Sequence, residues 1–389
     1  MRSLKQSITN YLTLIFSFFL GFGQFDPFGT NGFFFQILTV LLMLQIACFS
    51  DVLKSASKYK SELLLLFLIV LIFFFAGVIY GYSNFKLFPL NFKLILAIVI
   101  FWFLSYTFLL NKKLILYSCL AFSLSCTLIV ILYSLGIVVP ERDLNEGVRL
   151  ILFGENPNSL STRFTLSFII LLYITIENPL SLKKYRYVFL FALPLLFSAV
   201  LKSGSKGSFI FLLFGSGVLI MLSNIKNYVK FSLFTLGLIL LIYSIPSIEE
   251  SVVFWRFSNS SSLSTGRGDI WMHVLDIFFT YPFGVGEAGY LTEITKRYET
   301  IDTHNIFLYI MVCGGFISAI LFLLFLIILL RKAIRALKNK SSFQIVLLCI
   351  ILLMASKTGG VLTYLVMWYF FAVINSLSTS YNKYPKIVQ

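Results

Sequence analysis

The chain has 389 residues, of which 59% are hydrophobic and 12% are charged, and its mean hydropathy is +0.93. A soluble protein needs more polar surface than this to cover its core, so the composition excludes a soluble enzyme and indicates that lipid solvates much of the surface. The net charge of +15 does not indicate a nucleic-acid partner, because the charges fall in short clusters between apolar runs. We therefore predict an all-α, polytopic helical membrane protein that forms a single integral membrane domain over residues 1–389.

Twelve apolar runs approach the length of about 20 residues that a membrane-spanning helix needs. The first run follows a basic N-terminus and ends without a small-residue cleavage site, so we expect it to be retained as a span and not removed as a signal peptide. The predicted spans are residues 8–24, 33–50, 63–83, 90–110, 114–139, 159–176, 187–201, 207–223, 229–245, 304–330, 342–356 and 359–377.

The distribution of charge predicts the orientation of these spans. With the N-terminus in the cytoplasm, the inward segments carry 19 of the 31 lysines and arginines but only 3 of the 16 acids. Basic loops stay on the cytoplasmic side of a membrane, so an even number of spans with both termini in the cytoplasm is expected. The five cysteines lie inside apolar runs and form no CxxC pair, which indicates neither a disulfide nor a metal site.

Two predicted outward segments are longer than simple turns. Residues 140–158 are mixed in charge and end in Asn156-Pro157-Asn158, which is a helix-start signal. Residues 246–303 form a 58-residue loop that holds 8 of the 16 acids, and loops of this length are often functional. Within it, residues 269–281 have the spacing of an amphipathic helix, which ends at a break rich in proline and glycine.

Cations gather at the outward ends of the sixth and eighth spans. The eighth span follows Lys202-Ser203-Gly204-Ser205-Lys206-Gly207, where small residues expose backbone N–H groups at a helix N-terminus and Lys206 adds a charge. This combination suits an anion, although a short solvated turn explains the same residues. Arg163 lies about one turn inside the sixth span and either faces a cavity or extends to the interface.

The long loop adds two arginines and leads to the chain's two histidines. Arg256 lies in its first part, and Arg267 lies between two glycines that allow close approach of a ligand such as a diphosphate. A surface arginine in a turn is the alternative. His273 has an aspartate on either side of it on the predicted helix face, which local surface pairing explains. His304 lies where the loop re-enters the membrane, and a histidine there can serve as a general base near neutral pH.

Short motifs follow one another in a characteristic order over residues 155–330. The motifs are Glu155-Asn156-Pro157-Asn158, Ser203-Gly204-Ser205-Lys206-Gly207, Thr265-Gly266-Arg267 with Trp271, Tyr281-Pro282-Phe283-Gly284-Val285-Gly286, and Thr303-His304-Asn305 leading to Gly314-Gly315. Together they resemble the bacterial O-antigen polymerase and O-antigen ligase superfamily. The resemblance implies a helical membrane fold of the GT-C type with one large periplasmic loop. It also implies a glycosyltransferase of the cell inner membrane that acts on undecaprenyl-diphosphate-linked oligosaccharides without a metal or another cofactor.

Residue roles follow from the same resemblance, position by position. His304 would deprotonate the acceptor hydroxyl, while Arg267 and Lys206 would hold the donor diphosphate. Lysine at position 206, where arginine is common in the family, lacks the bidentate geometry of a guanidinium. The further candidates for substrate binding are Arg163, Arg256, Asn156 and Lys202.

Three functions are compatible with the sequence. A polymerase joins repeat units to one another, and we favour it because the Asn-Pro-Asn and Gly-Val-Gly elements are more typical of polymerases. A ligase transfers the finished chain to lipid A core. A lipid-linked oligosaccharide flippase or another transporter predicts charges within the spans and short loops on both sides, which this sequence does not have. A flippase and a chain-length regulator are candidate partners in addition to the lipid bilayer and the lipid-linked substrate.

Overall fold

The computed structural model describes residues 2–23, 56–82, 88–143, 147–243, 249, 251–258, 267–298, 303–339, 341–357, 362 and 364–379. Within them the α-helices are α1 (Arg2–Phe22), α4 (Lys60–Ile79), α5 (Phe88–Leu110), α6 (Lys112–Ser134), α7 (Pro157–Glu177), α8 (Ala192–Lys202), α9 (Lys206–Leu222), α10 (Asn227–Tyr243), α12 (Val252–Ser258), α13 (Arg267–Thr280), α14 (Gly286–Thr295), α15 (Ile306–Lys338), α16 (Phe343–Ala355) and α17 (Leu365–Thr379). The remaining elements are two 3-10 helices, η1 (Ala56–Tyr59) and η3 (Lys183–Phe191), and two strands, β1 (Glu141–Asp143) and β2 (Gly147–Ile151).

The prediction of a polytopic helical membrane protein is confirmed. Six helical stretches in the described ranges are long and apolar enough to cross a bilayer, and three shorter helices are also apolar. Each predicted span that falls in these ranges contains a helix. The seventh begins as the 3-10 helix η3 before it continues as α8. The second predicted span, 33–50, lies outside the described residues. The strands β1 and β2 form a small antiparallel hairpin beside the helices.

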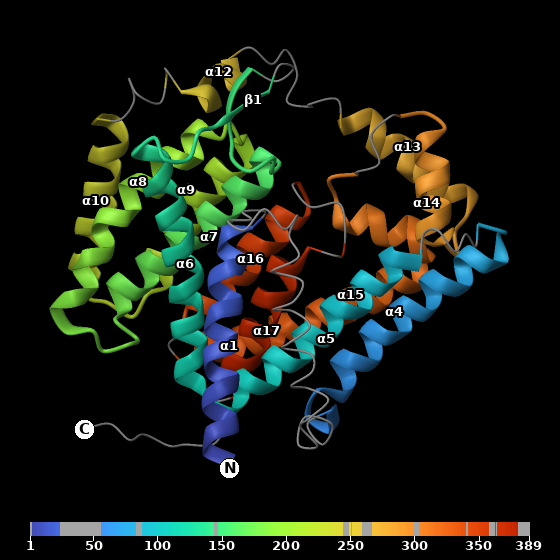
Figure 1. Cartoon of the computed structure of the whole chain (residues 1–389), viewed down its shortest axis with the longest axis horizontal. Coiled ribbons are helices and arrows are strands. Elements are labelled where there is room, and N and C mark those ends of the chain that lie inside the picture. Colours follow the sequence, from blue (N-terminus) through green and yellow to red (C-terminus); the bar gives the residue numbers. More distant parts are fainter. Residues whose placement is uncertain are drawn as a thin grey trace.

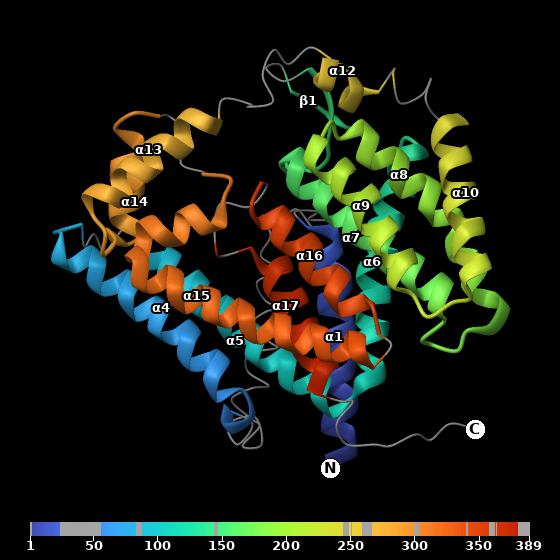
Figure 2. The ribbon, with the colours of Figure 1, turned by 180° about the vertical axis from the view of Figure 1, so that it is seen from behind.

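The helices form two groups joined by a central set (Figure 1). On one side lie α6 to α10, on the other lie α4, α13, α14 and the first part of α15, and α1, α16 and α17 lie between them, as the reverse view also shows (Figure 2). Helix α17 is the core element, because Val366 to Ile374 are all buried. In contrast, α4 and α10 expose large apolar side chains such as Phe67, Phe75 and Phe231, as expected of surfaces that face acyl chains.

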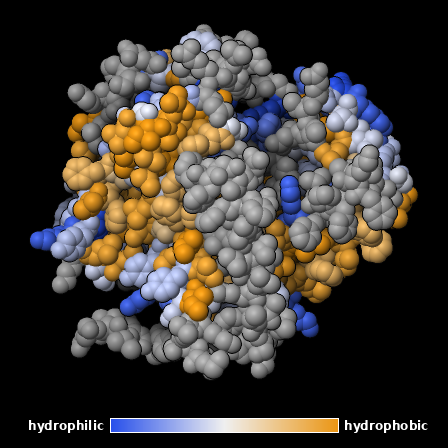
Figure 3. Space-filling model, in the orientation of Figure 1, coloured by the Kyte–Doolittle hydropathy of each residue, from blue (hydrophilic) through white to orange (hydrophobic). Residues whose placement is uncertain are grey.

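Polar elements lie together at one end of the bundle. The hairpin, α12 and α13 lie at the upper end of Figure 1, whereas α1 begins at the lower end. Hydrophobic side chains cover the flank formed by α8 to α10, and hydrophilic side chains gather over α13 and α14 (Figure 3). The start of the long loop, at α12, and its helix α13 therefore lie toward the end of the molecule opposite to the start of α1.

Helix α15 connects the two ends and is kinked near its start. Gly315 has φ 65° and ψ −166° inside the helix, so the segment from Ile306 to Gly314 runs in a different direction from the rest. A glycine tolerates this conformation, which other residues rarely adopt. The last turns of α15 carry Arg331, Lys332, Arg335 and Lys338.

Candidate functional site

The residues before and after His304 are anchored by α13, α14 and the start of α15. The indole Nε1 of Trp271 in α13 donates to the carbonyl of Thr303 at 2.9 Å, and the Thr303 N–H donates to the hydroxyl of Tyr290 in α14 at 3.1 Å. Asn305 caps α15, because its side-chain oxygen accepts from the N–H groups of Phe307 and Leu308. Between these anchors His304 has φ 50°, in the left-handed region. The Trp271 and His304 motifs, 33 residues apart in sequence, therefore form one unit.

The Pro-Phe-Gly-Val-Gly segment docks this unit onto the kink of α15. The Phe316 N–H donates to the Pro282 carbonyl at 3.0 Å, and the Val285 N–H donates to the Val312 carbonyl at 2.9 Å. Gly284 has φ 88°, and a Cβ on it would lie 2.6 Å from the backbone of α15 at Cys313 and Gly315. The glycines of this motif thus allow its backbone to pack directly against neighbouring helices.

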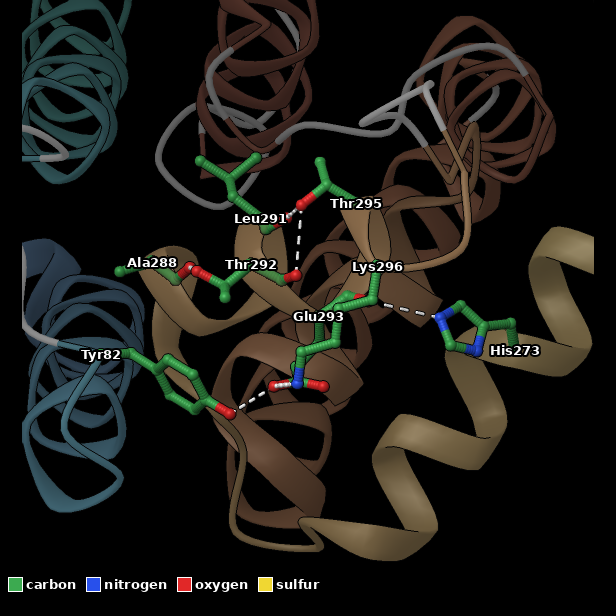
Figure 4. Close-up of polar contacts among 8 residues, drawn as sticks. All are labelled: Tyr82, His273, Ala288, Leu291, Thr292, Glu293, Thr295 and Lys296. Carbon is green, nitrogen blue, oxygen red and sulfur yellow. Dashed lines mark hydrogen bonds and ion pairs between the residues drawn. The ribbon is translucent and has the colours of Figure 1, made fainter.

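A second set of contacts fixes α14 to α4 and α13 (Figure 4). The Glu293 carboxylate accepts from the hydroxyl of Tyr82, at the end of α4, and from the Lys296 ammonium at 2.6 Å. The Nε2 of His273 in α13 lies 3.4 Å from the Glu293 carbonyl, and its ring lies 5.6 Å from that of Tyr298. His273 therefore joins two helices of the loop.

Electrostatics strengthen the Glu293 contacts. Burial alone would raise the pKa of the Glu293 carboxyl, but the hydrogen bonds from Lys296 and Tyr82 outweigh it and hold that pKa below its usual value. The hydrogen bond to Glu293 also raises the pKa of Lys296 and that of Tyr82. Glu287, six residues earlier in α14, accepts from the Tyr309 hydroxyl at 2.6 Å, and burial raises the pKa of its carboxyl.

The turn between α8 and α9 collects cations from distant parts of the chain. The Arg149 Nε of β2 donates to the Ser203 carbonyl at 2.9 Å, and the Arg256 Nη1 of α12 donates to the Gly204 carbonyl at 2.9 Å. Gly204 has φ 68°, and a Cβ there would approach Val252 to 2.9 Å. The glycine therefore permits both the turn and the close approach of α12.

Two further cations extend this cluster toward α13. Lys206, the first residue of α9, places its ammonium 5.0 Å from the centre of the Phe257 ring. Lys357, directly after α16, has its Cδ 4.0 Å from the position of a Cβ on Gly207. Its carbonyl accepts from the Arg267 Nη1 at 2.6 Å. We call Arg149, Lys206, Arg256, Arg267 and Lys357 the cation cluster.

The cation cluster and His304 are linked through α13. Arg267 and Trp271 are four residues apart in one helix, so they lie about one turn, roughly 6 Å along the axis, from each other. Trp271 holds Thr303, next to His304, while Arg267 holds the chain at Lys357. Hydrogen bonds thus join the neighbour of His304 to α13 and Arg267 to Lys357, and Lys357 lies beside Gly207, next to Lys206.

The other three predicted residues have contacts of their own. Arg163 is 2% exposed in its side chain and forms an ion pair with Glu155. Asn156 is the N-cap of α7, because its side chain accepts from the Asn158 N–H at 2.8 Å. The Lys202 ammonium lies 5.1 Å from the centre of the Tyr133 ring, and the residue is exposed. Each of these three residues thus has a partner within the protein, although the buried Nε of Arg163 has no hydrogen-bond partner among the described residues.

Sequence reasoning did not identify Arg149 or Lys357. Arg149 lies in the outward segment 140–158, whose mixed charge was the only signal. Lys357 lies between two short apolar helices in a stretch that is otherwise uncharged, which is a recognisable signal for a cation at a helix end. Among the described residues, no group of three or more His, Cys, Asp or Glu side chains could hold a metal ion.

Comparisons with known proteins agree with the motifs. Residues 189–323 match the family described as O-antigen ligase. The chain is also 22% identical over 378 residues to the ComP-specific O-oligosaccharyltransferase of Acinetobacter baylyi (strain ATCC 33305 / BD413 / ADP1). That alignment covers 88% of this chain and 66% of the relative, so the chain spans less than two thirds of the relative's length. The predicted resemblance to the O-antigen polymerase and ligase superfamily is confirmed. Both descriptions are those of enzymes that transfer oligosaccharides, which favours glycosyl transfer over transport.

Proposed function

We propose that this protein is an inverting glycosyltransferase that moves an oligosaccharide from undecaprenyl diphosphate to an acceptor hydroxyl at the outward face of the membrane. The observation that supports this most is the link through α13, which connects His304 on one side with the cation cluster on the other. A base and a group of cations within one rigid unit are what the transfer of a sugar from a diphosphate requires.

The reaction divides between these two groups. Arg267, Lys206 and Lys357 bind the donor diphosphate and stabilise the negative charge that grows on it as the bond to the anomeric carbon breaks. His304 takes the proton of the acceptor hydroxyl, whose oxygen attacks the same carbon from the opposite side. Direct displacement inverts the anomeric centre, and the diphosphate itself leaves without a metal or cofactor from the protein.

The acceptor we favour is a second lipid-linked repeat unit, which makes the protein an O-antigen polymerase. The Asn-Pro-Asn start of α7 and the Gly-Val-Gly docking segment support this choice. The comparisons favour a second candidate, transfer to another acceptor, because their descriptions name an O-antigen ligase and an O-oligosaccharyltransferase specific for a protein. In that case the acceptor is the hydroxyl of lipid A core or of a protein side chain.

The proposal includes an orientation. The excess of lysine and arginine in alternate loops supports placement of both termini in the cytoplasm, with residues 246–303 in the periplasm of a cell with an inner membrane. A lipid-linked substrate that has been flipped across the membrane would then arrive at the end of the bundle where α12 and α13 lie. A flippase that supplies it and a regulator of chain length are the partners expected with a polymerase.

The direct test uses purified protein, a lipid-linked repeat unit and no added metal. Products with two or more joined repeat units support the polymerase, whereas transfer only to added lipid A core or acceptor protein supports the second candidate. In cells, loss of a polymerase leaves one repeat unit on lipopolysaccharide, and loss of a ligase leaves none. Failure of any glycan transfer by a folded protein that binds the donor would refute the proposal.

A further inference from the structure

The backbone at His304 is in a conformation that a residue with a side chain rarely adopts. Its φ of 50° lies in the left-handed region, which costs free energy for residues other than glycine. Such a conformation persists only where the neighbouring structure enforces it. The contacts of the adjacent residue, Thr303, are therefore informative.

Thr303 is completely buried, and each of its polar groups has a partner. Its N–H donates to Tyr290, its carbonyl accepts from Trp271, and its hydroxyl donates to the Asn305 carbonyl at 2.9 Å. The residue after His304 is equally constrained, because Asn305 caps α15. His304 is thus the middle residue of a segment that is held at both ends.

The two side chains that hold Thr303 come from different helices. Trp271 belongs to α13, whose first residue, Arg267, is part of the cation cluster. Tyr290 belongs to α14 and is 2% exposed, and its ring packs edge-on against that of Tyr309 in α15, with 5.0 Å between ring centres. The hydrogen bonds of Trp271 and Tyr290 therefore tie the backbone at His304 to α13 and α14.

From this geometry we infer that Trp271 and Tyr290 are positioning residues, which hold His304 in its left-handed conformation at a fixed distance from Arg267. The inference rests on the proposed function, in which His304 takes the acceptor proton. Proton transfer depends on placement within a fraction of an ångström, so a freed Thr303 reduces catalysis without weakening donor binding. The two side chains act on His304 through the backbone of Thr303 beside it.

The test compares Trp271→Phe and Tyr290→Phe with matched controls. Each variant removes one hydrogen-bonding group and keeps an aromatic ring. Trp255→Phe in α12 and Tyr298→Phe near the end of the loop are the controls, because the hydrogen bonds of Thr303 in the described part of the chain go to other residues. We expect kcat per folded protein to fall by about tenfold in each test variant, while the KM for the lipid-linked donor stays unchanged. An equal kcat in test and control variants would overturn the inference.

A measurement without turnover separates this inference from the proposed function. The measurement is NMR of protein labelled selectively at histidine. The chain has only two histidines, so in a His273→Gln background the single histidine signal is that of His304. We expect Trp271→Phe and Tyr290→Phe to shift and broaden this signal, and the two controls to leave it in place. An unmoved signal in the test variants refutes the positioning role even if the protein transfers no sugar. A moved signal in a protein without transferase activity supports the positioning role and refutes the function.

Discussion

The ion pair between Arg163 and Glu155 allows a decisive test of what Arg163 does. The two side chains are 2% and 6% exposed, and the guanidinium lies against Gly23 at the end of α1, where a Cβ would overlap it. Arg163→Met removes the charge and leaves the Glu155 carboxylate buried without this partner. Removal of one member of a buried pair costs about 3–5 kcal/mol, which is a large part of a typical folding free energy.

The double variant separates structure from binding. Arg163→Met combined with Glu155→Leu removes both buried charges and keeps apolar volume at both positions. Replacement of a buried pair by hydrophobic residues is often neutral or stabilising, so most of the lost stability should return. If Arg163 acts only through this pair, the double variant regains transferase activity together with stability.

The assay is heating of the protein in detergent, followed by size-exclusion chromatography of the fraction that stays monodisperse. The single variant should lose its folded peak at a clearly lower temperature than the wild type, and the double variant should approach the wild type. A single variant as stable as the wild type would refute the structural reading. A stable double variant that does not bind or transfer the donor would instead establish Arg163 as a substrate-binding residue.

Three further predictions concern the loop and the cation cluster. Gly284→Ala should prevent docking of the loop onto α15 and reduce the yield of folded protein. Gly81 also has a positive φ but has open space around it, so Gly81→Ala should reduce the yield less. Expression of both variants in parallel compares the two yields. Lys357→Gln should raise the donor KM by about tenfold with little change in stability, whereas Lys338→Gln, at the last residue of α15, should not change the donor KM. Hydrogen bonds lower the pKa of Glu293, so its stabilising effect is fully present above its usual pKa and is lost as pH falls through the lowered pKa. Proteolysis of the loop should therefore increase in acid, and less so in Glu293→Gln, which has no carboxylate to protonate.

Most of the membrane fold follows from the sequence, because long apolar runs have few other stable arrangements. The start of α7 at Asn156-Pro157 follows from capping chemistry in the same way. The 3-10 start of the seventh span and the β1–β2 hairpin cannot be predicted from the local sequence, since both depend on tertiary contacts. The hairpin is fixed by the contact of Arg149 with Ser203, 54 residues away.

The site is only partly visible in the sequence. The order of the motifs indicates that Arg267 and His304 act together, and both lie in the contact series through α13. Their connection through Trp271 and Thr303 is a tertiary contact that no local pattern encodes. A charge within a span indicates a constrained position, but the sequence leaves open whether Arg163 pairs with a protein carboxylate or with a ligand. The buried contact with Glu155 favours the first of these.

The boundary of the family match separates two parts of the site. Residues 189–323 include His304, which we propose as the base, and Arg267, Lys206 and Arg256, which form most of the cation cluster. Arg149 and Lys357 lie outside the matched range, yet they contact its motifs at Ser203 and Arg267. If the proposed function holds, polymerases, ligases and oligosaccharyltransferases share the base and the diphosphate site, whereas their acceptors differ. Differences in acceptor choice are then expected in the segments around the matched range, among which β2 and the residues after α16 contact the cation cluster.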